Sequence, residues 1–67
     1  MITQQMKDSR KMQQALGRAK SCRTPIYIAD SINEIWPQES TNKKKEIFYW
    51  VTAVALADFA QNRKYPF

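Results

Sequence analysis

The feature that most constrains the fold is an apolar run of 14 residues at positions 47–60, in which Thr52 and Asp58 are the polar members. A membrane span takes about 20 apolar residues, whereas runs of about 10 to 14 are typical of buried helices. On a helix these side chains point to every side, and a helix that is apolar all round is buried all round. We therefore predict a buried helix over residues 42–63, capped within residues 40–42.

Two shorter helices are predicted before it, over residues 3–20 and residues 25–36. The first is rich in Gln, Lys, Arg, Met and Ala, which lose little side-chain freedom in a helix. Its apolar stripe is narrow, with a gap at Ser9, and Gly17 costs about 1 kcal/mol relative to alanine. The expected fold is a small all-α domain of three helices that comprises residues 1–67.

The second of these helices has clear boundary signals and one alternative. Thr24 suits the N-cap, Pro25 suits the first helical position, and Pro37 ends the helix. The alternative is a short strand over residues 24–28, because the sequence Ile-Tyr-Ile within it favours sheets. We favour the helix.

With that strand, the order strand, short helix, longer helix over residues 23–62 resembles the ribbon-helix-helix repressors and plasmid partition proteins. The resemblance implies an intertwined dimer, with Arg23 and Tyr27 on the DNA-facing side of a two-stranded ribbon. It concerns the order of elements alone, and Pro25 removes one donor from such a ribbon.

The chain is short enough that its own core needs support from elsewhere. At 67 residues it lies near the lower limit for a domain that folds alone. The single cysteine, Cys22, closes no intrachain disulfide, and a chain without histidine lacks the usual zinc ligand sets, so no metal or cofactor is expected. We predict a homodimer through the apolar C-terminal helix. The expected interface residues are Phe48, Trp50, Val51, Val54 and Phe59.

The net charge of +5 is concentrated in the basic N-terminal segment, residues 1–23, where six basic residues face Asp8 alone. Segregated positive charge indicates a polyanion or an acidic protein surface as partner. The start of the long helix carries further lysines. The predicted nucleic-acid-binding residues are Lys7, Arg10, Lys11, Arg18, Lys20, Arg23, Lys43 and Lys44.

Nothing in the sequence indicates catalysis or a small-molecule substrate. There is no histidine for general base chemistry and no glycine-rich loop, and the carboxylates of Asp30 and Glu34 are best interpreted as the solvated face of a helix. The single free cysteine and the lack of a signal-peptide core in residues 1–20 favour the cytoplasm.

We therefore predict a small non-enzymatic regulatory protein that binds nucleic acid, DNA in the first place, through its basic N-terminal segment. The alternative is a protein-binding modulator, an inhibitor or adaptor, that engages a larger target through its apolar, aromatic C-terminal helix.

Overall fold

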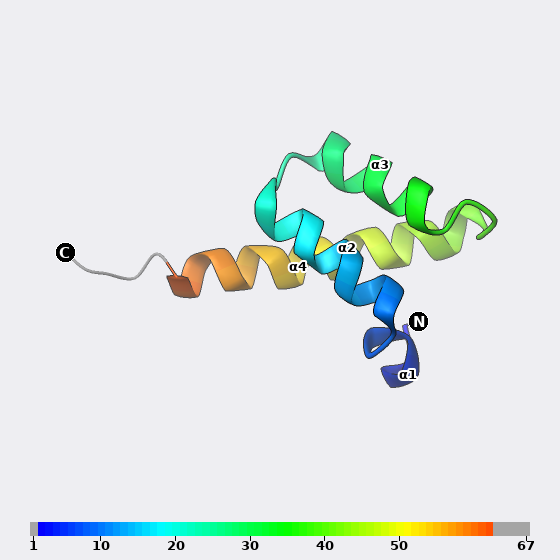
Figure 1. The fold of residues 1–67 in the computed structure, drawn as a ribbon, viewed down its shortest axis with the longest axis horizontal. Coiled ribbons are helices and arrows are strands. Elements are labelled where there is room, and N and C mark those ends of the chain that lie inside the picture. The colour runs from blue at the N-terminus through cyan, green and yellow to red at the C-terminus, as the bar shows by residue number, and fades with distance from the viewer. Residues whose placement is uncertain (1, 63–67) are drawn as a thin grey trace.

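The computed structural model describes residues 2–62, which form four helices and no strand (Figure 1). They are α1 (Gln4–Lys7), α2 (Arg10–Ser21), α3 (Pro25–Ile35) and α4 (Thr41–Asn62). The helices α2, α3 and α4 pack against one another, and α1 packs against α2. The all-α prediction is confirmed.

The N-terminal segment forms two helices where one was predicted. Ser9 has an extended backbone, its hydroxyl accepts a hydrogen bond from the amide of Met12 at 3.2 Å, and it donates to the carbonyl oxygen of Met6 at 2.8 Å. The same side chain therefore caps the start of α2 and binds the end of α1. These side-chain hydrogen bonds replace backbone hydrogen bonds that one continuous helix would form at this point. The gap in the apolar stripe at Ser9 marks this break.

Helix α3 begins where the proline signal predicted. Thr24 is extended, Pro25 occupies the first turn, and the amide of Ile28 donates to the Thr24 carbonyl at 3.0 Å. The strand alternative for residues 24–28 is therefore wrong, and the ribbon-helix-helix arrangement that depended on it is not formed. Proline costs a helix nothing at this position, because its missing N–H would have no partner there.

Helix α4 starts one residue before the predicted boundary, and residue 63 of the prediction lies outside the described residues. Ser40 is its N-cap, since its hydroxyl accepts from the Lys43 amide at 3.2 Å and its carbonyl accepts from the Lys44 amide at 3.0 Å. Figure 1 shows the C-terminal part of α4 extending past α2 and α3. Among the described helices, none combines the length and apolarity needed to cross a membrane.

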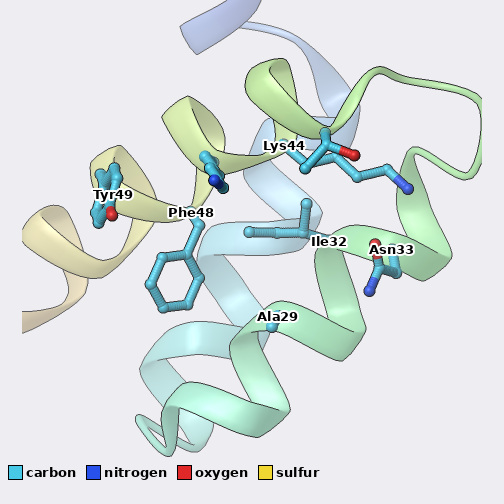
Figure 2. Close-up of a pocket in the computed structure, with 8 residues that line it drawn as sticks. Ala29, Ile32, Asn33, Lys44, Phe48 and Tyr49 are labelled. Carbon is cyan, nitrogen blue, oxygen red and sulfur yellow. The ribbon is translucent and has the colours of Figure 1, made fainter.

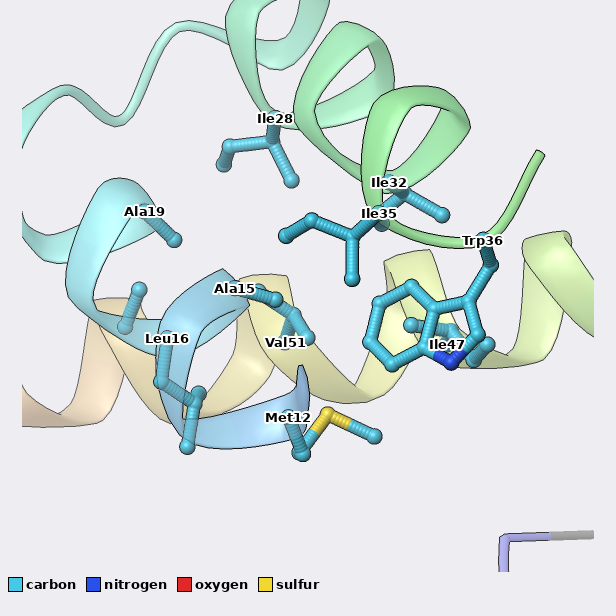
Figure 3. Packing of buried hydrophobic residues seen from close by; sticks show 11 residues of the cluster. Met12, Ala15, Leu16, Ala19, Ile28, Ile32, Ile35, Trp36, Ile47 and Val51 are labelled. Carbon is cyan, nitrogen blue, oxygen red and sulfur yellow. The ribbon is translucent and has the colours of Figure 1, made fainter. Parts of the chain in front are cut away.

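The core lies where the three longer helices meet (Figure 3). The helix α2 contributes its inward stripe, α3 contributes three isoleucines together with Trp36, and α4 contributes residues spaced four apart. The buried apolar residues are Met12, Ala15, Leu16, Ala19, Ile28, Ile32, Ile35, Trp36, Ile47, Val51 and Ala55. Burial of each large side chain among them stabilises the fold by about 1.5–3 kcal/mol. The core therefore holds the three helices, and the residues on their outer sides, in a fixed arrangement.

Only one side of α4 is buried by this chain. Ile47, Val51 and Ala55 are at most 1% exposed, but Tyr49 is 68% and Leu56 is 53% exposed. The expectation of burial on every side is therefore not met within one copy of the described chain.

Candidate interaction surfaces

The outward face of α2 is cationic and polar. The buried residues of α2, which are Met12, Ala15, Leu16 and Ala19, lie in the core. The opposite side of the helix is therefore left to solvent. We call this surface the α2 outer face; its exposed residues are Arg10, Lys11, Gln13, Gln14, Gly17, Lys20 and Ser21. No Asp or Glu occurs within α2, so no carboxylate of this helix neutralises these cations.

Arg18, at the edge of this face, is engaged within the chain. It forms an ion pair with Glu34 of α3 across the α2–α3 contact. This hydrogen bond raises the pKa of Arg18, because the carboxylate favours the charged guanidinium. Arg18 therefore connects α2 to α3 in addition to contributing positive charge to the surface.

Two further basic residues of the N-terminal segment lie over aromatic rings of α4. The Arg23 guanidinium carbon is 3.9 Å from the ring centroid of Phe59, and Lys7 Nζ is 5.6 Å from the ring of Trp50. Both are half-buried, as expected of cation–π contacts that hold a segment against a helix. Of the six predicted N-terminal cations, Arg10, Lys11 and Lys20 are thus the exposed ones, and Lys7, Arg18 and Arg23 make contacts within the chain.

Of the two predicted lysines at the start of α4, Lys44 lies apart from the α2 outer face, on the α3 side of the helix. Lys43 and Lys44 are half-buried, and Lys44 lines a groove of about 280 Å³ between α3 and α4 (Figure 2). In that view α2 lies behind α3 and α4, so the groove opens on the far side of the pair from α2. The residues that line it are Ala29, Ile32, Asn33, Thr41, Lys44, Lys45, Phe48 and Tyr49.

The predicted interface residues of α4 mostly turn toward this chain's own core. Val51 is 0% exposed, and the other four, Phe48, Trp50, Val54 and Phe59, are half-buried. The apolar residues of α4 left to solvent are instead Tyr49, Ala53, Leu56, Ala57 and Ala60. We call four of them, Tyr49, Ala53, Leu56 and Ala60, the α4 outer stripe. They recur at intervals of four, three and four residues, the spacing of a helix–helix seam, and lie opposite the buried stripe.

Cys22 ends α2 and is half-buried in the turn before α3. Its sulfur lies 3.4 Å from Thr24 Oγ1, and the Thr24 hydroxyl, which can donate to the thiolate, lowers the pKa of the thiol. In residues 2–62 no three side chains of His, Cys, Asp or Glu gather in a metal-binding group.

Comparison with known proteins returned no similar protein: no family model matches the sequence, and no curated protein or solved structure matches it. The function is therefore inferred from the surfaces of the chain.

Proposed function

We propose that the protein is a small non-enzymatic regulatory protein that binds nucleic acid, with DNA as its target, through the α2 outer face. The observation that carries the proposal is the exposed set Arg10, Lys11 and Lys20 on a helix that holds no acidic residue. Such cations neutralise phosphates and release counterions. The amides of Gln13 and Gln14 beside them supply donors and acceptors for phosphate, sugar or base edges.

The shape of this face fits a duplex groove. The 12 residues of α2 make a helix about 18 Å long, backed by α3 and α4, so it forms an outward ridge. The major groove of DNA, about 12 Å wide, admits one helix. Gly17 lies near the middle of the ridge, and a Cβ built there meets nothing within 4 Å, so the chain's own packing does not require a glycine. We assign Gly17 to close approach of the helix backbone to a phosphate.

We further propose a homodimer through the α4 outer stripe. An antiparallel pair of α4 helices places Tyr49 opposite Ala60 of the second copy and Leu56 opposite Ala53, so each large side chain meets a small one. This alternation of large and small side chains permits close packing along the seam. The antiparallel orientation of the two helices also places their dipoles favourably. The two-fold axis of such a dimer presents two α2 outer faces, as a palindromic DNA site requires.

The first test is fluorescence anisotropy of a labelled duplex DNA with the full chain at two salt concentrations. With three exposed cations per protomer in contact with phosphates, affinity falls by about 40-fold for one bound protomer between about 50 and 200 mM salt, and by about the square of that factor for a bound dimer. Absence of binding at the lower salt, or binding that salt does not change, contradicts the proposal.

A further inference from the structure

The groove between α3 and α4 combines an apolar floor with a cationic rim. Ala29 and Ile32 of α3 face Phe48 of α4 across the floor (Figure 2). Lys44 and Lys45 stand at the rim, and Lys44 extends from α4 toward α3. The volume of about 280 Å³ lies just below the range of drug-sized ligand pockets and suits one or two apolar side chains.

The two rim lysines are the fourth and fifth residues of α4 and lie where its first turn meets its second, at the end of the helix where positive charge is unfavourable. The N-terminal end of a helix carries a partial positive charge, so cations close to it raise its energy. Within residues 2–62 neither Lys44 nor Lys45 forms an ion pair that offsets this cost. An anionic group bound from outside would receive attraction from both lysines and from the helix end.

We propose that this groove is the docking site for an acidic amphipathic peptide segment of a partner protein. Its apolar side chains fill the floor over Ile32 and Phe48, and its carboxylates contact Lys44 and Lys45. Asn33 at the α3 rim offers an amide to the peptide backbone. This is the helix-in-groove mode of recognition, in which apolar anchors give affinity and charge pairs give specificity.

A peptide fits the groove better than nucleic acid does. Phosphates would contact the lysines but leave the apolar floor unfilled, and the groove opens away from the α2 outer face. A protein with both surfaces connects a bound nucleic acid to an acidic partner, which is how a small regulator recruits another component. The groove proposal does not depend on nucleic-acid binding by α2.

The test uses the ¹⁵N-labelled full chain and a defined synthetic peptide of about 16 residues. The peptide carries leucines at helical spacing on one face and glutamates beside them; one matched control replaces glutamate by lysine and the other replaces leucine by serine. The acidic peptide should shift the amide resonances of Ala29, Asn33 and residues 44–49 and leave those of α2 unchanged. Both control peptides should bind at least about tenfold more weakly.

The double variant Lys44→Glu/Lys45→Glu should lose binding of the acidic peptide by at least about tenfold and should bind the lysine peptide instead. Such an exchange of partner charge cannot arise from misfolding. The matched variant Arg10→Glu/Lys11→Glu carries the same charge change on α2 and should bind the acidic peptide like the unaltered chain.

Three outcomes overturn the proposal. The first is no shift of the groove amides at peptide concentrations up to about 1 mM, or equal binding of the lysine peptide. The second is a shift of these amides on addition of duplex DNA, which assigns the groove to nucleic acid. The third is a shift of the amides of Ala29, Asn33 and Lys44, which lie off the α4 outer stripe, when the chain alone is concentrated; this assigns the groove to a second copy.

Discussion

The guanidinium of Arg23 lies 3.9 Å from the ring centroid of Phe59 and connects the turn before α3 to the last turns of α4. This part of α4 extends past the other helices, and the contact ties it to the turn that precedes α3 (Figure 1). Both side chains are half-buried, a setting in which a cation–π contact is stronger than at a fully exposed site.

We expect a coupling free energy of about 1–2 kcal/mol between these two side chains. It is measured by urea unfolding of Arg23→Ala, Phe59→Ala and the double variant, so that the cycle removes the separate effect of each truncation. Additive losses in the double variant would show that the two residues stabilise the fold independently.

The boundaries of α3 and α4 were predicted to within one residue over the described chain. The reason is local chemistry: Pro25 and Pro37 bracket one helix, and Ser40 caps the other. The break at Ser9 was not predicted, because the composition of residues 3–20 favours helix throughout and one capping hydrogen bond interrupts it.

The exposed face of α4 could not be predicted from its sequence. A helix with apolar residues on all sides carries no periodic signal that distinguishes inside from outside, so Val51 was assigned to the interface together with Trp50. The packing of α2 and α3 decides that Val51 points inward and Tyr49 outward. In the basic segment, charge alone did not distinguish the exposed Arg10 from Arg18, which pairs with Glu34.

Replacement of Ser9 by alanine should destabilise the chain by about 1 kcal/mol, because the Met12 amide loses its capping acceptor. Urea unfolding followed by circular dichroism measures the loss. Ser21→Ala, at the exposed last residue of α2, is the matched control and should change the free energy of unfolding by less than about 0.5 kcal/mol. Equal effects of the two substitutions would show that the cap contributes nothing.

The substitution Gly17→Ala should separate stability from binding. The added Cβ meets open space, and alanine favours the helix, so the free energy of unfolding should rise by about 0.5–1 kcal/mol. If the helix backbone approaches a phosphate at this position, duplex DNA binding should weaken in the same variant. A stabilised protein with unchanged DNA affinity would remove Gly17 from the proposed contact.

Charge reversal at Arg10 and Lys11 should abolish DNA binding without unfolding the protein, because both side chains are exposed and outside the core. The matched variant Lys44→Glu/Lys45→Glu has the same net charge and should keep most of the affinity, measured by anisotropy in low salt. Equal losses in the two variants would indicate an effect of net charge rather than a binding face.

The antiparallel seam of α4 can be tested by cross-linking of single cysteines introduced after Cys22→Ser. Positions 49 and 60 are 11 residues apart, so at about 1.5 Å per residue two copies of the same position lie at least about 16 Å apart in an antiparallel pair. A disulfide needs Cα atoms within about 7 Å. Tyr49→Cys and Ala60→Cys should therefore each remain uncross-linked alone and form a disulfide dimer when the two variants are mixed under oxidation. A parallel pair would give the reverse, with each variant cross-linking to itself, and a chain that sediments as a monomer at every concentration would exclude the seam altogether.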